Sequence, residues 1–191
     1  MEFSELKRRL PNYGKYLLIL FVWWVIELVI MVLLLSGTAR IGCKGIRIDR
    51  AGNIYVGLTE EIRVFNSKGQ LLRTISPQTS KDYVFEIDGN KLLVDCASTS
   101  YVMDLNGVVV EQRSYPQLPS TIKTPKKITV NGTTYHINCS FFYRVTIEEN
   151  GEKTVAVQMP ILDLIVEIAF FVAWATFFVF LLAVLRKLRK P

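Results

Sequence analysis

The chain of 191 residues contains a single histidine and only three cysteines, so the side chains most often used for metal binding and nucleophilic catalysis are scarce. His136 lies in the alternating stretch TTYHIN, and no nucleophile or orienting partner accompanies it, which is typical of an ordinary strand histidine. No Cys/His spacing matches a zinc site. The acids of the central segment are scattered over turns and alternate strand positions. The sequence therefore predicts no enzymatic activity, no metal and no cofactor.

Long apolar runs are present at both ends of the chain, from Tyr16 to Leu35 and from Ile161 to Leu185. Each has about the 20 residues that a helix needs to cross a bilayer core about 30 Å thick. The sequence therefore predicts a multi-pass protein of the cell membrane.

Basic residues flank both runs on their terminal sides: Lys7, Arg8, Arg9, Lys15, Arg186, Lys187, Arg189 and Lys190. Short basic flanks are retained in the cytoplasm, so we expect both termini there and residues 37–159 outside the cytoplasm. The expected division is a basic tail at 1–15, transmembrane helices at 16–36 and 160–185, and a second basic tail at 186–191. Because these flanks suit anionic lipid headgroups, the net charge of +6 does not indicate a nucleic-acid partner.

A cleaved signal peptide is the alternative for the first run, since the small residues Gly37 and Ala39 would suit a signal peptidase. The run is longer than the core of about 7 to 15 residues that signal peptides have. It also carries two tryptophans and Glu27, which are unusual in such a core. An uncleaved signal anchor is the favoured interpretation.

The central segment has the pattern of β structure throughout, with short alternating runs separated by turn residues and no helical periodicity. Its glycines recur in pairs, which are Gly52 and Gly69, Gly89 and Gly107, and Gly132 and Gly151. The second turns of the later pairs contain Asn-Gly, the strongest short hairpin signal. The spacing predicts three repeats of four strands each, at about 44–76, 82–114 and 126–158.

The first repeat, IRIDRAGNIYVGLTEEIRVFNSKGQLLRTI, combines an Asp-x-x-Gly-Asn-Ile-Tyr-Val stretch with an Ile-x-Val-Phe-x-x-x-Gly stretch. Over residues 46–75 it resembles a blade of the NHL-type six-bladed β-propellers. The other two repeats keep the turns and the alternation but few of the family's specific residues. The resemblance implies a blade-like fold and a binding surface, and it implies nothing catalytic.

Three blades are too few for a closed propeller, which typically has four to eight, and an open array leaves strand edges exposed. Three arrangements remain as alternatives. A homodimer could close a six-bladed ring, a partner chain could cover the edges, or the repeats could form a compact sandwich or bent sheet. The proline-containing loop 114–125 would suit a change of sheet before the third repeat. The expected fold class is thus a membrane protein with two transmembrane α-helices flanking an all-β extracytoplasmic domain of three four-stranded repeats, either a partial propeller or a sandwich.

Two cysteines, Cys96 and Cys139, occupy equivalent places in the second and third repeats, seven residues after Gly89 and Gly132. Equivalent positions in adjacent blades can lie close together, so a Cys96–Cys139 disulfide is one expectation for an oxidising compartment, with Cys43 left over. The alternative is that both are inherited core residues, since a buried thiol behaves as a small hydrophobe.

Acids within the apolar runs are more informative than those of the central segment, because a carboxylate near the bilayer centre costs about 2.5 to 3.5 kcal/mol. Glu27 lies in the middle of the first run, and Asp163 and Glu167 are four residues apart on the second, so these two share a helix face. Counted from the external ends at 1.5 Å per residue, Glu27 lies about 13 Å deep and Glu167 about 10 Å. They can therefore meet at one level.

These acids allow two interpretations. They could bond between helices of one chain or of a homo-oligomer, or they could pair with a basic residue of another membrane protein or line an ion path. The small residues Ala169, Ala173 and Thr176 form a separate stripe, which predicts a second helix-packing face. Two contact faces favour assembly beyond a simple two-helix hairpin.

Together these features predict a non-catalytic, membrane-anchored binding or sensing module, or an accessory subunit of a membrane complex. Its expected partners are the lipid bilayer and either a second copy of the chain or another membrane protein. A membrane-bound cell-envelope hydrolase and a small channel or transporter subunit that uses the intramembrane acids are the alternatives.

Overall fold

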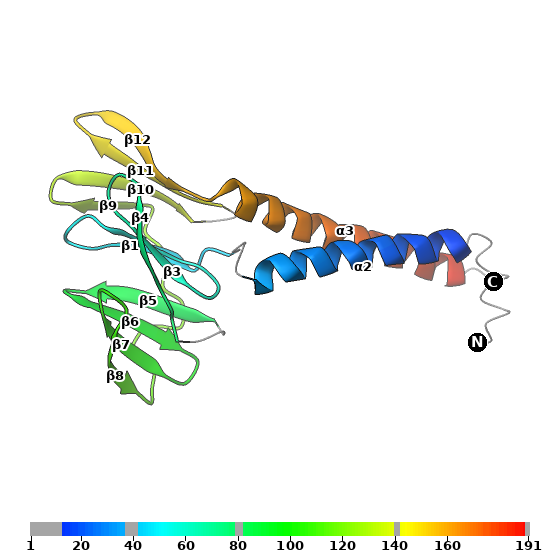
Figure 1. The fold of residues 1–191 in the computed structure, drawn as a ribbon, viewed down its shortest axis with the longest axis horizontal. Helices are drawn as coiled ribbons and strands as arrows, with labels where there is room; N and C mark the ends of the chain where they lie inside the picture. The colour runs from blue at the N-terminus through cyan, green and yellow to red at the C-terminus, as the bar shows by residue number, and fades with distance from the viewer. Residues whose placement is uncertain (1–12, 37–41, 79–81, 140–141, 190–191) are drawn as a thin grey trace. The chain divides into compact units, whose positions relative to one another are not determined.

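The computed structural model describes residues 13–36, 42–78, 82–139 and 142–189, which belong to two compact units. One unit contains the helices α2 (Tyr13–Leu35) and α3 (Ile161–Arg189), and both are long and apolar enough to cross a membrane. The other unit, the β domain, lies between them in the sequence and contains the described strands (Figure 1).

Three four-stranded antiparallel sheets make up the β domain, and each is a meander of consecutive strands. The first sheet contains β1 (Gly45–Ile48), β2 (Ile54–Gly57), β3 (Ile62–Phe65) and β4 (Leu71–Ile75). The second contains β5 (Tyr83–Asp88), β6 (Lys91–Cys96), β7 (Ser100–Asp104) and β8 (Val109–Arg113). The third contains β9 (Lys127–Val130), β10 (Thr133–Cys139), β11 (Tyr143–Glu149) and β12 (Glu152–Gln158). The three repeats of four strands predicted from the glycine spacing are therefore confirmed (Figure 1).

Three turns between strands share one hydrogen-bond pattern, which an Asp or Asn side chain builds. In the β1–β2 turn, Asp49 Oδ1 accepts the backbone N–H groups of Ala51 at 2.9 Å and Asn53 at 2.8 Å. Asn66 and Asp104 do the same at the same offsets in the β3–β4 and β7–β8 turns. The glycine three residues after each of them has a φ between 75° and 90°. That left-handed conformation is why the glycines of these turns recur in the sequence.

The third sheet uses tighter turns. Asn131-Gly132 and Asn150-Gly151 each connect directly paired strand ends, and both residues of each turn have positive φ, near 50° for Asn and near 83° for Gly. Positive φ at both central residues is the geometry of the type I′ turn, which matches the twist of hairpin strands. The Asn-Gly hairpins are confirmed here, whereas Asn106-Gly107 belongs to the Asp-supported turn of the second sheet.

The first sheet lies between the other two in the β domain, because β1 contacts β5 of the second sheet and β10 of the third (Figure 1). On one side, the buried Arg47 donates from Nε to Glu86 Oε2 at 2.8 Å and lies 5.7 Å from the ring centre of Phe85. On the other side, Asn131 Nδ2 donates to the carbonyl oxygen of Arg50 at 2.7 Å. The spatial order of the sheets therefore differs from their order in the sequence.

A hydrophobic cluster joins the first and second sheets, and its buried members are Tyr55, Ile62, Val64, Ile75, Tyr83, Phe85, Leu92, Val94 and Met103. Most come from the first three strands of each sheet. The fourth strands, β4, β8 and β12, are mostly exposed. The core thus lies between the inner strands, and each sheet presents its last strand at the surface.

The two helices pack as an antiparallel pair. Tyr16 of α2 lies against Phe180 of α3, with ring centres 5.7 Å apart, and Trp23 stacks on Phe177 at 4.5 Å. The indole Nε1 of Trp23 also donates to the carbonyl oxygen of Ala173 at 3.1 Å. These contacts define one face on each helix, and most of the remaining side chains are exposed and apolar.

Candidate functional site

Carboxylic acids lie along the contact face of the helix pair. Glu27 is half-buried and follows Trp23 by four residues, which places both on the same face of α2. On α3, Asp163 is 2% exposed and Glu167 is 6% exposed, and their spacing puts them on one face as predicted. We call Glu27, Asp163 and Glu167 the helix acids.

Two of the helix acids have an oxygen without a partner. Among the residues that the structure describes, Glu27 Oε1 and Glu167 Oε2 are buried side-chain atoms with no hydrogen-bond partner. A buried polar atom left unsatisfied costs about 1 to 3 kcal/mol. The expectation that Glu27 and Glu167 bond to each other is therefore not met at these two atoms, and both retain capacity for a further donor.

The small residues of α3 do not form a contact face of their own in the described pair. Ala173 is buried, and its carbonyl oxygen accepts the Trp23 indole, so it lies on the side that faces α2. Ala169 is half-buried, while Thr176 is exposed and donates its hydroxyl to the Val172 carbonyl at 2.8 Å. The prediction of a separate stripe is wrong at Ala173, because the helix pair uses this small residue for close approach.

The β domain contains a cavity of about 590 Å³. Its walls come from the start of the first sheet, the paired ends of β5 and β6, and the loop before the third sheet. Apolar side chains on the walls include Val84, Ala97, Leu118 and Ile122. Cavities of about 300 to 1,000 Å³ with mostly apolar walls are typical of small-molecule sites.

Asp95 is the buried acid of this cavity, with 3% of its surface exposed. One carboxylate oxygen, Oδ2, accepts the backbone N–H groups of Gln117 and Leu118, which fixes the loop over the end of β6. The other oxygen, Oδ1, has no hydrogen-bond partner among the described residues. Asp95 thus holds the loop with one oxygen and keeps the other unsatisfied.

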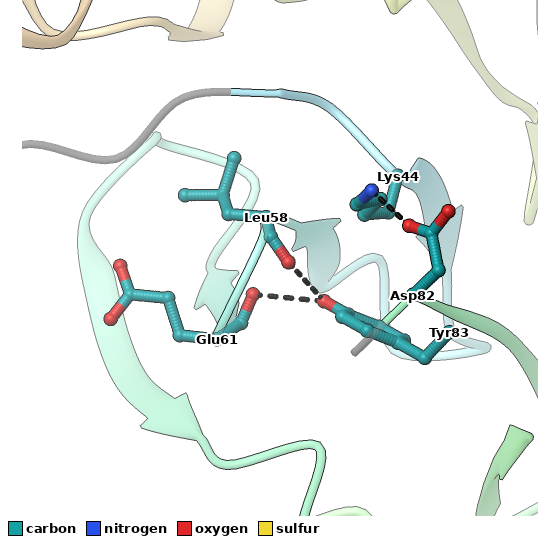
Figure 2. Close-up of polar contacts among 5 residues, drawn as sticks. All are labelled: Lys44, Leu58, Glu61, Asp82 and Tyr83. Atoms are coloured by element: carbon teal, nitrogen blue, oxygen red, sulfur yellow. Dashed lines mark hydrogen bonds and ion pairs between the residues drawn. The ribbon is translucent and has the colours of Figure 1, made fainter. Parts of the chain in front are cut away.

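Lys44, Asp82 and Tyr83 also line the cavity and belong to a polar cluster. Lys44 and Asp82 form an ion pair, and the neighbouring Tyr83 hydroxyl donates to the carbonyl oxygens of Leu58 at 2.6 Å and Glu61 at 3.1 Å (Figure 2). Burial raises the pKa of the Tyr83 phenol above its ordinary value. Tyr83 therefore stays neutral and bonds the second sheet to the first.

The disulfide of the β domain joins Cys43 to Cys139, with Cα atoms 5.8 Å apart, and Cys96 is not part of it. The expected Cys96–Cys139 bond is therefore wrong. The reason lies in the order of the sheets: the first sheet separates the second, which carries Cys96, from the third, which carries Cys139. Cys43, just before β1, is instead close to the end of β10.

His136 pairs with an acid of its own sheet. Its Nε2 lies 2.5 Å from Glu148 Oε2, and Lys153 Nζ lies 3.8 Å from the same oxygen. The hydrogen bond from His136 lowers the pKa of Glu148, and the charge of Lys153 lowers it further. Within the described part of the chain no group of three His, Cys, Asp or Glu residues could hold a metal ion.

The sequence alone did not predict the role of Asp95 or the pairing of Cys43. The available signal for Asp95 was its place in KLLVDC, where an acid directly follows Val94 and interrupts the alternation of the strand. In the structure both Val94 and Asp95 are buried. Cys43 gave no such signal, because its pairing depends on which sheets are neighbours.

Comparison with known proteins gives no relative by sequence: no family model and no curated protein matches the chain. Among solved structures, one of Kluyveromyces lactis, described as "Hsv2 complete loop 6CD", is similar with a TM-score of 0.33 and 6% sequence identity. The match covers 61% of this chain and 37% of the Hsv2 chain. This chain thus spans about a third of the structure that it matches, and the likeness carries no argument about function.

Proposed function

We propose that the chain is a two-pass membrane protein that presents its β domain outside the cytoplasm as a non-catalytic binding or sensing module, within a larger membrane assembly. The observation that carries the proposal is the pair of long apolar helices at the two ends of a separate, disulfide-linked β domain. Such a chain displays a folded surface on one side of a bilayer.

Charge and redox chemistry support this orientation. The basic flanks at Lys7 to Lys15 and at Arg186 to Lys190 favour a cytoplasmic location for both ends. The Cys43–Cys139 disulfide suits an oxidising compartment on the other side of the membrane. Two independent features therefore favour the same topology.

The outer strands of the β domain support a role in protein binding. The fourth strand ends each sheet, and it carries exposed apolar side chains: Leu71 is 55% exposed, Val110 66% and Val155 45%. An uncovered strand with apolar side chains is a template for pairing with another chain. Three propeller-like blades with such edges fit a module that is completed by a second copy or by a partner.

The helix acids support assembly inside the membrane. Glu27 and Glu167 each carry a buried oxygen without a partner, and an ionisable side chain at bilayer depth usually has one. A donor from a further helix would remove the cost of leaving these oxygens unsatisfied. We therefore propose that Glu27 and Glu167 contribute to contacts with a second copy or with another membrane protein.

Native mass spectrometry after extraction in mild detergent tests the assembly. We expect an oligomer or a complex with a second protein, and we expect the double substitution Glu27→Gln with Glu167→Gln to reduce its yield at least fivefold. Val179→Thr is the control, because Val179 is 69% exposed on α3 and belongs neither to the helix acids nor to the predicted small-residue stripe. A monomer without a partner that is indifferent to both carboxyl changes would refute the assembly.

Protease protection tests the topology separately. Epitope tags at both termini and in the Gly89-Asn90 turn, where Gly89 has open space around it, leave the sheets intact. On intact cells, protease should remove only the tag in the turn. Removal of a terminal tag, or protection of the turn, would contradict the proposed orientation.

A further inference from the structure

We infer that the cavity of the β domain binds an organic amine, a primary ammonium group on an apolar body, with Asp95 as the carboxylate that receives the ammonium group. The inference rests on the proposed binding function and gives it a site and a ligand class. It follows from the geometry of Asp95, the charges around it and the walls of the cavity.

The geometry of Asp95 leaves one carboxylate oxygen without a hydrogen-bond partner. The carboxylate is 3% exposed, and its Oδ2 is fixed by the backbone N–H groups of Gln117 and Leu118. These bonds hold the side chain in the wall of the cavity, where Oδ1 is buried and has no partner in the described structure. A donor on a ligand would complete the hydrogen bonding of this buried carboxylate.

The charges around the cavity favour a cation over a neutral donor. Lys44 is engaged by Asp82, and Arg113 forms a bidentate pair with Glu111 at 2.7 and 2.9 Å. The pKa of Arg113 is raised first by this bond to Glu111 and to a lesser extent by the charge of Asp95. Among the described residues that line the cavity, Asp95 is therefore the acid without an ion-pair partner. An ammonium group would supply the missing charge through a charge-assisted hydrogen bond, which is about twice as strong as a neutral one.

The walls determine the rest of the ligand. Val84, Ala97, Leu118 and Ile122 are apolar, and the volume of about 590 Å³ is large enough for an aromatic or branched aliphatic group. Burying such a group against these side chains favours binding through the hydrophobic effect. A bare inorganic cation would leave this apolar surface unused, so the site suits an amine with an apolar body.

Fluorine NMR on the full chain in nanodiscs of zwitterionic lipid tests the inference, with empty nanodiscs as the reference for partition into lipid. The probes are 4-fluorobenzylammonium and its uncharged analogue 4-fluorobenzyl alcohol. We expect the ammonium probe to bind at least tenfold more tightly than the alcohol. Asp95→Asn should weaken ammonium binding at least tenfold, whereas Asp88→Asn, the same change at an exposed site on β5, should have no effect. Equal binding of the two probes, or binding that Asp95→Asn leaves intact, would overturn the inference.

Because Asp95 also holds the loop, its substitution could unfold the β domain. A second pair of variants, at a position that does not hold the loop through Asp95, then tests whether the probe binds in the cavity. Ser120 lines the cavity from an exposed position, so Ser120→Trp should fill the space and abolish ammonium binding, while Ser120→Ala should not. Unchanged binding in Ser120→Trp would show that the probe binds outside the cavity and would overturn the inference. Topology and assembly are measured without the probe, so failure of amine binding leaves the proposed function standing.

Discussion

The β domain and the helix pair treat buried carboxylates in opposite ways. Asp49 in the β domain is 4% exposed and accepts hydrogen bonds from the backbone N–H groups of Ala51 and Asn53, from the Asn53 side chain and from the Tyr55 hydroxyl. Glu167 in the helix pair is 6% exposed, and its Oε2 has no partner among the described residues. A saturated acid stabilises its own fold, whereas an unsaturated acid has capacity for a ligand or a partner. The comparison therefore separates structural acids from candidate functional ones.

Asp95 shows that the distinction does not follow the boundary between the two units. It belongs to the β domain, and one of its oxygens is satisfied in the manner of Asp49, yet the other is free of hydrogen bonds in the manner of Glu167. One residue thus combines both roles. The predictions below test whether hydrogen-bond saturation, rather than location, decides what an acid does.

The largest effect should come from the covalent bond that closes the β domain. Cys139→Ser removes the bond to Cys43 across 96 residues of chain, and the loss should lower the free energy of unfolding by about 2 to 5 kcal/mol. Chemical denaturation of the β domain within the full chain measures the loss, with unfolding monitored by far-UV circular dichroism near the β-sheet minimum. Cys96→Ser is the control and should leave the disulfide intact. A non-reducing peptide map that links Cys96 to Cys139 would contradict the order of the sheets.

The next largest effect should come from the saturated acid. Asp49→Ala leaves two backbone N–H groups and the Tyr55 hydroxyl without their acceptor, and we expect a loss of about 3 kcal/mol in the free energy of unfolding. The control is Asp104→Ala, which removes the same turn pattern at a half-buried position whose hydrogen bonds are exposed to solvent, and its effect should be much smaller. Equal losses in the two variants would show that the turn, and not burial of a saturated acid, stabilises the domain.

A glycine contact between the first and third sheets should follow. A Cβ at Gly69 would lie 1.7 Å from the carbonyl oxygen of Ala156, so Gly69→Ala must displace backbone as well as occupy a φ of 75°. We expect a loss of about 2 to 3 kcal/mol. Gly132→Ala shares the positive φ but has open space, and it should cost about 1 kcal/mol. If the two substitutions cost the same in thermal or chemical denaturation, Gly69 does not form a sheet-to-sheet contact.

The unsaturated acid should respond with the opposite sign to Asp49. Replacing a buried polar group that lacks a partner by an apolar one removes a cost, so Glu167→Leu should leave the helix pair as stable as before or stabilise it by about 1 kcal/mol. The same change should weaken assembly with a further helix. Reversible unfolding in detergent, monitored by the fluorescence of the three tryptophans, all of which lie in α2 and α3, gives the stability. A loss as large as that of Asp49→Ala would remove the distinction between the two acids.

Local patterns made much of this fold predictable. The glycine spacing and the Asn-Gly pairs predicted the four-strand repeats, because a turn with positive φ favours Gly and Asn at fixed positions in the sequence. The apolar runs predicted the two helices, because the length and composition of a continuous segment are also local properties of the sequence. The pairing of Cys43 with Cys139, the burial of Ala173 against α2 and the open oxygen of Asp95 were not predictable, since each depends on which elements are neighbours in space.

The smallest effect concerns an acid that is neither buried nor unsaturated. Glu148 accepts a hydrogen bond from His136, which lowers the pKa of its carboxyl group, and the charge of Lys153 acts in the same direction. His136→Gln should therefore raise the pKa of Glu148 toward its ordinary value. Carbon NMR titration of the Glu148 carboxyl measures the change, and Thr129→Val, on the neighbouring β9, is a control that should leave it unaltered.

The sign of the accompanying pH dependence follows from linkage. A group whose pKa is lower in the folded state stabilises the fold above its unfolded pKa and loses that contribution as the pH falls through its folded pKa. Wild-type protein should thus lose a small part of its stability on acidification through the range where carboxyl groups titrate, and His136→Gln should lose less. Because Glu148 is solvated on the surface of the third sheet, the difference should also shrink at high salt. A stability difference that persists at high salt would assign Glu148 to the structural acids beside Asp49.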